Sequence, residues 1–109
     1  MGDIFKDRGK AFESKYKHDQ EMLFKISVRR NRLLGLWAAE KLGIATQEAE
    51  GYAKEVIASD FEEPGDEDVV RKVLADFNEK SVDIGEKALR KQMNILNETA
   101  RLQIIQDAD

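Results

Sequence analysis

The chain has 109 residues, of which 37% are charged and 41% apolar, with one Pro, no Cys and a formal net charge of −4 at pH 7. This length suits one compact domain, and the lack of Cys excludes disulfide frameworks, thiolate metal sites and cysteine nucleophiles. No apolar run approaches the roughly 20 residues of a membrane-spanning helix, and charges interrupt the N-terminus where a signal peptide has its apolar region.

The pattern of the chain is helical throughout, because strong helix formers dominate and no sustained apolar and polar alternation indicates a strand. From Asp19, apolar residues recur at helical steps, and Gly43 is placed to end the first helix in a left-handed conformation. We expect Trp37 to anchor the core opposite Val73 or Phe77. The predicted buried stripe is Leu23, Ile26, Arg30, Leu33, Leu34, Trp37, Ala38 and Leu42.

Two further helices follow, each with a predicted N-cap. Thr46 is the expected N-cap of the second helix, which ends before Pro64 and Gly65, and Asp66 is the expected N-cap of the third. The stripe predicted for the second helix is Ala49, Tyr52, Ala53, Val56 and Ile57. The stripe predicted for the third helix is Val69, Val70, Val73, Leu74 and Phe77.

A fourth helix is predicted after a turn at residues 81–83. Asp83, with Glu86 three residues later, has the spacing of a capping box. The predicted stripe is Ile84, Ala88, Leu89, Gln92, Ile95, Leu96, Thr99 and Leu102. Four helices joined by short loops predict an all-α protein, in which residues 19–109 form an antiparallel four-helix bundle.

Residues 1–18 have a different character from the bundle. They contain Phe5, Phe12 and Tyr16, three of the eight aromatic residues, which share one helical face with Leu23. Gly9 lies inside this pattern and costs about 1 kcal/mol relative to Ala, and isolated helices of this length are marginal in water. We therefore expect a mobile segment that is helical only when its aromatic face is covered.

The charge is also divided along the chain. Residues 1–33 hold nine basic and five acidic side chains, whereas residues 34–109 hold nine basic and seventeen acidic ones. Such asymmetry is typical of a solvated tail on an acidic body and, less often, of a segment steered to a separate partner. The acidic balance argues against nucleic acid as the partner, although Arg29, Arg30 and Arg32 form a basic cluster. Ion pairs along the helix or with the acidic second helix are the alternative role for these arginines.

Side chains that carry catalytic chemistry are few. His18 is the only His and has no neighbouring group that completes a nucleophile or metal site, so a solvated His is favoured over a pH switch. The acidic run at residues 62–68 lacks the ligand spacing of a calcium loop, which favours helix capping and a solvated corner. No phosphate loop and no catalytic triad is present. We predict a protein that is not an enzyme and has no metal site.

Several stretches of the sequence resemble the zeta subunit of the α-proteobacterial F-type ATP synthase, a family of inhibitors of ATP hydrolysis. The resemblance covers nearly the whole chain and thins in the fourth helix. It rests on Phe5-Lys6-Asp7-Arg8, Ala11-Phe12-Glu13, Arg29-Arg30-Asn31-Arg32-Leu33-Leu34-Gly35-Leu36-Trp37-Ala38-Ala39-Glu40, Tyr52-Ala53-Lys54-Glu55-Val56 and the run from Asp60 to Val69.

The resemblance implies how such a protein acts. Residues 1–18 would be an inhibitory segment that inserts as a helix between catalytic and non-catalytic subunits of the head, near the rotor stalk. The apolar anchors would be Ile4, Phe5, Phe12 and Tyr16, with Arg8 and Lys10 as charge partners. We expect a cytoplasmic protein that is a monomer when free and is peripheral at the inner membrane through ATP synthase.

Two alternatives stay open. The resemblance implies no required cofactor but weak binding of ATP or ADP by the bundle, for which Arg29, Arg30 and Arg32 are the candidate residues. A nucleotide-sensing helical module with little inhibitory activity is therefore the second hypothesis, and Gly9, where the family has a helix-forming residue, bears on inhibitory strength. A basic N-terminus that docks on an anionic membrane is a third hypothesis, which the acidic residues in the first third disfavour.

Overall fold

A computed structural model of the chain describes the backbone of residues 2–60 and 65–107 and the side chains of residues 19–60 and 65–107. The described chain consists of four helices, α1 (Gly2–Leu42), α2 (Thr46–Ser59), α3 (Glu67–Glu79) and α4 (Glu86–Asp107), with no strand among them. The predicted all-α, four-helix architecture is confirmed. None of these helices combines the length and apolar character needed to cross a bilayer.

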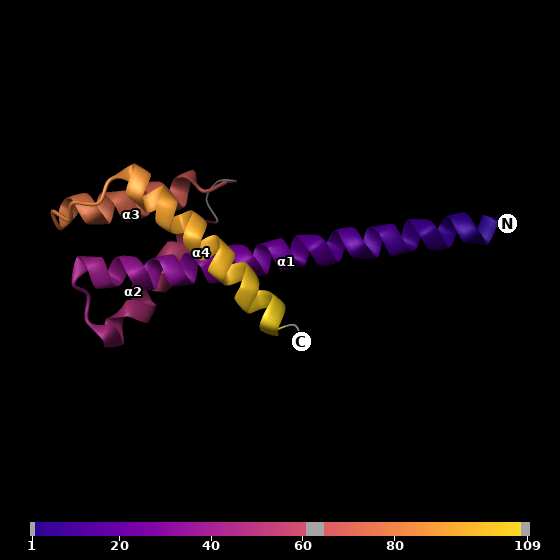
Figure 1. Cartoon of the computed structure of the whole chain (residues 1–109), viewed down its shortest axis with the longest axis horizontal. Helices are drawn as coiled ribbons and strands as arrows, with labels where there is room; N and C mark the ends of the chain where they lie inside the picture. The colour runs from indigo at the N-terminus through magenta and orange to yellow at the C-terminus, as the bar shows by residue number, and fades with distance from the viewer. Residues whose placement is uncertain (1, 61–64, 108–109) are drawn as a thin grey trace.

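Helix α1 is the axis of the molecule. Its 41 residues correspond to about 60 Å at 1.5 Å per residue. It contacts each of the other three helices, most extensively α2 and α4, which pack on its C-terminal half. The N-terminal half extends away from this body, so the molecule measures 67 × 27 × 21 Å (Figure 1). Residues 2–18 and the first bundle helix thus form one continuous helix, as predicted. That residues 1–18 are helical only when a partner covers their aromatic face stays a prediction.

The C-terminus of α1 has the end predicted from Gly43. This glycine has φ = 74°, its N–H donates to the Glu40 carbonyl at 3.2 Å, and the Ile44 N–H donates to the Ala39 carbonyl at 2.9 Å. These two bonds form a Schellman motif. Ile44 then packs against the core and starts the connection to α2.

Helix α2 crosses α1 at a point where the backbones nearly touch. A Cβ added to Gly35 would lie 2.5 Å from the Cα of Ala53. Tyr52, Ala53 and Val56 are buried as predicted, whereas Ile57 is only half-buried. The prediction of Thr46 as the N-cap is wrong by one residue, because Ala45 has the extended backbone of the cap and its carbonyl accepts from the Glu48 N–H.

Helix α3 has its predicted buried face. Val69, Val70, Val73 and Phe77 are buried, and Leu74 is partly buried against the core. Asp66 occupies the predicted N-cap position but makes no side-chain capping bond. The helix ends in a second Schellman motif, in which Val82 donates to the Phe77 carbonyl at 2.8 Å and Ser81 to the Asn78 carbonyl at 3.2 Å. Ser81 has φ = 58°, the conformation usually left to glycine.

Helix α4 differs from its predicted form in two ways. It begins at Glu86, so the predicted capping box at Asp83 is wrong. Val82 and Ile84 pack against the core and hold the preceding chain out of the helix. The predicted buried stripe is right at Leu89 and Leu96 but omits Met93 and Ala100, which are buried. Ile95 and Leu102, two residues beyond Met93 and Ala100, point about 200° away and are 51% and 50% exposed.

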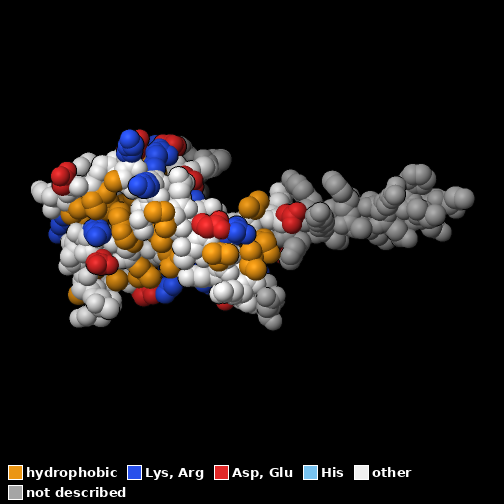
Figure 2. Space-filling view, in the orientation of Figure 1, with side chains coloured by type: hydrophobic (Ala, Val, Ile, Leu, Met, Phe, Trp, Pro, Cys, Tyr) orange, Lys and Arg blue, Asp and Glu red, His pale blue; other side chains and the backbone are white. Residues whose placement is uncertain are grey.

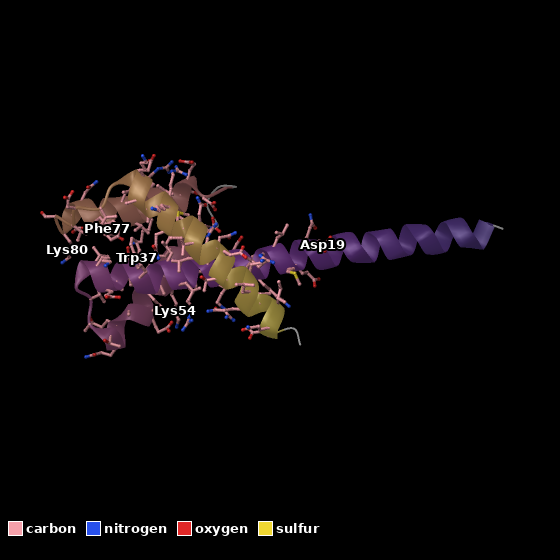
Figure 3. The ribbon with its side chains drawn as sticks, viewed as in Figure 1. Asp19, Trp37, Lys54, Phe77 and Lys80 are labelled. Carbon is pink, nitrogen blue, oxygen red and sulfur yellow. The ribbon has the colours of Figure 1, made fainter. Side chains whose placement is uncertain are left out.

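The core joins the four helices around Phe77. Trp37 meets Phe77 edge to face, with ring centroids 5.9 Å apart, which confirms its predicted place (Figure 3). The core continues through the fully buried Leu34, Val56 and Leu89. Leu23, predicted for this stripe, is instead 64% exposed, and the buried part of the stripe begins at Ile26.

Candidate functional site

The first candidate site is the stretch of α1 that leaves the body. Proceeding toward the N-terminus, Ile26 is the last buried residue of α1, at 7% exposure among the described side chains. Leu23 and Phe24 are 64% and 58% exposed, and Figure 2 shows hydrophobic side chains where the body narrows into the projecting helix. We call residues 2–25 of α1 the arm.

The arm contains all six residues predicted to bind a partner. Phe5, Phe12 and Tyr16 are separated by seven and four residues on a helix that is continuous from Gly2, so the backbone places them along one face. The side chains of the six lie outside the described residues, so their contacts stay predictions. These residues are Ile4, Phe5, Arg8, Lys10, Phe12 and Tyr16.

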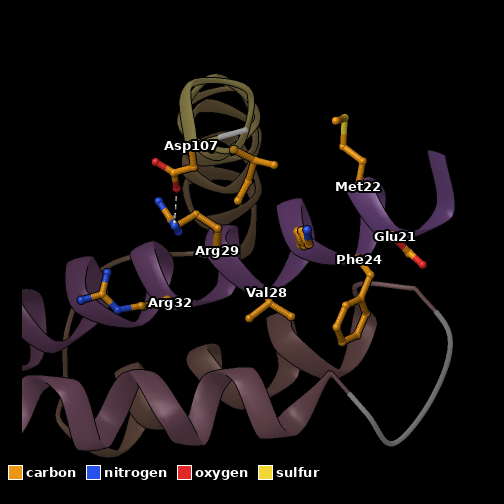
Figure 4. Close-up of a pocket in the computed structure, with 9 residues that line it drawn as sticks. Glu21, Met22, Phe24, Val28, Arg29, Arg32 and Asp107 are labelled. Carbon is orange, nitrogen blue, oxygen red and sulfur yellow. Dashed lines mark hydrogen bonds and ion pairs between the residues drawn. The ribbon is translucent and has the colours of Figure 1, made fainter. Parts of the chain in front are cut away.

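Arg29 connects α1 to the C-terminal turn of α4. Its guanidinium donates from Nη1 to Gln103 Oε1 at 2.8 Å. It also donates from Nη2 to Asp107 Oδ2 at 2.9 Å (Figure 4). Both α4 residues are 74 or more positions away in sequence. This pair therefore holds the end of α4 against the base of the arm.

Arg30 points to a different face of α1, toward the start of α3, and is buried at 6% exposure. It donates to Asn31 Oδ1 from Nε at 3.1 Å and from Nη2 at 2.9 Å, and to Asp66 Oδ1 at 2.8 Å. Asn31, only 1% exposed, donates in turn to Asp60 Oδ2 at 2.9 Å. This network joins α1 to the end of α2 and the start of α3, which explains why Asp66 does not cap its own helix.

Arg32 pairs with Glu50 of α2, as expected if its role is to bind the acidic second helix. The three arginines of the predicted cluster thus pair with α4, α3 and α2, and the structure does not bring all three into one site. Each already has a carboxylate partner, in Asp107, Asp66 and Glu50. Adjacent helical residues point about 100° apart, so the spacing predicts that Arg29 and Arg30 diverge, but it does not predict the partner of each arginine.

A groove lies between the base of the arm and the end of α4, with a volume of about 460 Å³. Its walls include the apolar side chains of Met22, Phe24, Val28 and Ile104 (Figure 4). Arg29 and Arg32 reach its edge, whereas Arg30 does not line it. Lys25, which sequence reasoning missed, also lines the groove, and no ion pair joins it to a described residue.

The acidic corner at the start of α3 has structural partners. Glu67 pairs with Arg90 of α4 at 2.9 Å, and Asp68, 5% exposed, accepts from Arg71 at 3.1 Å through Oδ1. The second oxygen of Asp68 is buried without a hydrogen bond. Among residues 19–60 and 65–107, no group of His, Asp or Glu has the geometry of a metal site.

Tyr52, Asp76 and Lys72 form a polar cluster between α2 and α3. Tyr52 donates to Asp76 Oδ2 at 2.7 Å, and Lys72 lies 2.9 Å from the same oxygen and 5.2 Å from the centre of the Tyr52 ring. Burial, and then the bond and charge of Asp76, raise the pKa of the Tyr52 hydroxyl. Burial lowers the pKa of Lys72, but Asp76 and Glu55 outweigh this and the pKa is raised overall. The Tyr52 hydroxyl thus joins α2 to the Lys72–Asp76 pair of α3.

Comparisons with known proteins identify what the chain is similar to. A family model described as ATPase inhibitor subunit zeta matches residues 1–103, and so includes the arm. A solved solution NMR structure superposes with a TM-score of 0.71 at 45% sequence identity, over 79% of this chain and 98% of that chain. A search of curated proteins finds no significant match.

Proposed function

The chain belongs to the ATPase inhibitor subunit zeta family, and on that basis we propose that it inhibits ATP hydrolysis by F-type ATP synthase through its arm. The observation that carries the proposal is the shape of α1. The helix extends beyond the body for about 36 Å, from Ile26 to the first turn. A helix that extends this far beyond the body of its own domain is suited to insertion between the subunits of a partner.

The proposed mechanism is a wedge. Ile4, Phe5, Phe12 and Tyr16 would fill an apolar cleft between a catalytic and a non-catalytic subunit of the head, near the rotor stalk. Arg8 and Lys10 would meet carboxylates at its edges. A catalytic interface held by this helix could not open for the next turnover. Because ordering the segment costs part of the contact energy, the affinity must come from a few buried anchors.

The bundle would be the folded base of this wedge. The core residues are all at or beyond Ile26, so the bundle stays intact while residues 1–18 contact the partner. The protein would then be a regulatory subunit without catalysis of its own. When free, it would be a cytoplasmic monomer. When bound to ATP synthase, it would lie peripherally at the inner membrane.

The proposal is tested by a double substitution of the arm. Phe5→Ala with Phe12→Ala should abolish inhibition of the cognate head in a steady-state hydrolysis assay while the thermal melt stays unchanged. The matched control is Ile95→Ala with Leu102→Ala, which removes two exposed apolar side chains from α4 and should inhibit fully. Full inhibition by the arm variant would contradict the wedge.

A second function, nucleotide sensing, is favoured by one observation. The groove beside the arm combines an aromatic wall at Phe24 with three cations, Lys25, Arg29 and Arg32. An adenine ring stacked on Phe24 with its phosphates near Lys25 would use this arrangement, and Arg30 would take no part. Calorimetric titration with ATP and ADP tests it, because binding that Lys25→Gln weakens would support sensing, and heats of dilution alone would exclude it.

A further inference from the structure

The end of α4 lies beside the base of the arm. The hydrogen bonds of Asn31 with Asp60 and of Arg30 with Asp66 join α1 to the end of α2 and the start of α3. Nearer the N-terminus, the end of α4 lies beside α1 through Arg29 and the groove residues Met22 and Ile104. The last turn of α4 therefore contacts α1 where the arm leaves the body.

Helix physics gives this contact a consequence for the arm. Starting a helix is costly, with a nucleation constant of about 10⁻³, whereas extending an existing helix costs little per residue. The arm is an extension of a helix that the bundle has already formed. Its helical population is the product of the propagation factors from the last fixed residue outward, and Gly9 lowers that product. Each turn of α1 that the body fixes thus raises the helical population of everything beyond it.

Resting on the function proposed above, we propose that Arg29, Gln103 and Asp107 form a clamp that positions the inhibitory segment. The clamp holds α1 at Arg29, one residue nearer to the arm than Arg30, and it sets the direction in which the arm leaves the body. Arg29 is a positioning residue in this account, since it acts through the helix and not through contact with the partner. The C-terminal turn of α4 would therefore regulate an activity located at the other end of the chain.

The clamp is suited to such a role because it is adjustable. Arg29 is 31% exposed and Asp107 is 60% exposed, so dissolved salt can screen the ion pair. Charged groups that face Arg29 from the packed elements are Asp107 of α4 and, across the groove, Glu21, Lys25 and Arg32 of α1 itself. The Arg30 network differs in its cation, which is buried, although the partner Asp66 is 49% exposed.

The test uses the full chain with Arg29→Met, which keeps the aliphatic stem and removes the donors. The matched control is Arg101→Met, which loses the same charge from α4 but pairs only with Glu98 of its own helix. We expect Arg29→Met to raise the concentration for half-maximal inhibition about two- to fivefold, the effect of losing one exposed ion pair. Arg101→Met should leave it unchanged.

A second measurement separates positioning from direct contact. NMR secondary chemical shifts of the arm in the free protein should fall toward coil values in Arg29→Met and not in Arg101→Met, and Gly9→Ala should restore them. Asp107→Asn, an end-of-helix change that spares the core, should act in the same direction, with Glu98→Gln as its control. Adding Gly9→Ala to Arg29→Met should also recover inhibition.

The outcomes are distinguishable. Weaker inhibition with unchanged arm helicity would mean that Arg29 touches the partner, and it would overturn the clamp. Unchanged inhibition and helicity in both Arg29→Met and Asp107→Asn would also overturn it. A wild-type chain that does not inhibit at all, with an arm that still loses helicity in Arg29→Met, would contradict the proposed function and support the clamp.

Discussion

Gly35 of α1 and Ala53 of α2 lie so close that no side chain fits between the two helices. A Cβ built on Gly35 would meet the Ala53 Cα at 2.5 Å and the Ala53 Cβ at 3.0 Å. Both residues are buried, so the clash could not be relieved by movement into solvent. This crossing fixes the separation of α1 and α2.

The first prediction concerns that crossing. Gly35→Ala should destabilise the protein by about 1–3 kcal/mol, because the added methyl forces the helix backbones apart. Gly51→Ala is the control, since Gly51 is also helical but a Cβ there meets nothing within 4 Å. It should stabilise by about 0.5–1 kcal/mol through helix propensity. Urea unfolding followed by circular dichroism measures both, and equal effects of the two substitutions would contradict the packing described.

The buried polar network leads to a second prediction. Asn31→Ala should cost about 2 kcal/mol, because Arg30 and Asp60 each lose a hydrogen-bond partner at a site that is almost fully buried. Asn94→Ala, an exposed change on α4, should stay within about 0.5 kcal/mol of the wild type. Both are read from chemical denaturation, and a neutral Asn31→Ala would show that the network does not contribute to stability.

A third prediction compares the two helix ends. Ser81→Gly should stabilise by up to about 1 kcal/mol, since glycine adopts φ = 58° without the cost that a Cβ imposes. Gly43→Ala should destabilise by about 1 kcal/mol for the same reason, at φ = 74°. Thermal melts of the two variants should move in opposite directions. A shift of the same sign would contradict the Schellman geometry assigned to these ends.

The fourth prediction is a loss of stability at alkaline pH. The folded-state pKa of Tyr52 is raised, and that of Lys72 is raised as well. The stability that each group contributes is therefore fully present below its unfolded-state pKa, about 10 to 10.4, and is lost as the pH rises through the folded-state value. The contribution of these two groups to the free energy of unfolding should be constant up to about pH 10 and should fall above that pH.

Tyr52→Phe isolates the tyrosine part of that fall. The variant should lose part of the alkaline dependence and keep the part due to Lys72, which still pairs with Asp76 at 2.9 Å. In a spectrophotometric titration, the difference between wild type and variant should show that Tyr52 ionises only as the protein unfolds. Ionisation near pH 10 in the folded protein would contradict the burial of this hydroxyl.

Most of the fold could be predicted from local patterns. Gly43 indicated the end of α1 because a left-handed residue is needed there, and Trp37 was placed beside Phe77 from helical spacing alone. The start of α4 could not be read in this way. Asp83 has the residue spacing of a cap, but the packing of Val82 and Ile84 on the core decides where the helix begins.

The candidate site was predictable only in part. The arm was found because Phe5, Phe12 and Tyr16 follow a helical step in an otherwise polar segment. The partners of Arg29 could not be predicted from the sequence, since both lie in a helix 74 or more residues later. Lys25 was not predicted as a site residue, because the groove that it lines forms only where α4 packs beside α1.

The central claim is that inhibition resides in the arm, and steady-state ATP hydrolysis by the cognate ATP synthase head tests it most directly. The full-length chain should be compared with one that begins at Asp19 and retains every buried residue of the bundle. The account predicts that the full-length chain inhibits and that the shortened chain does not, although both melt at similar temperatures. Inhibition of equal strength by the two chains would contradict it.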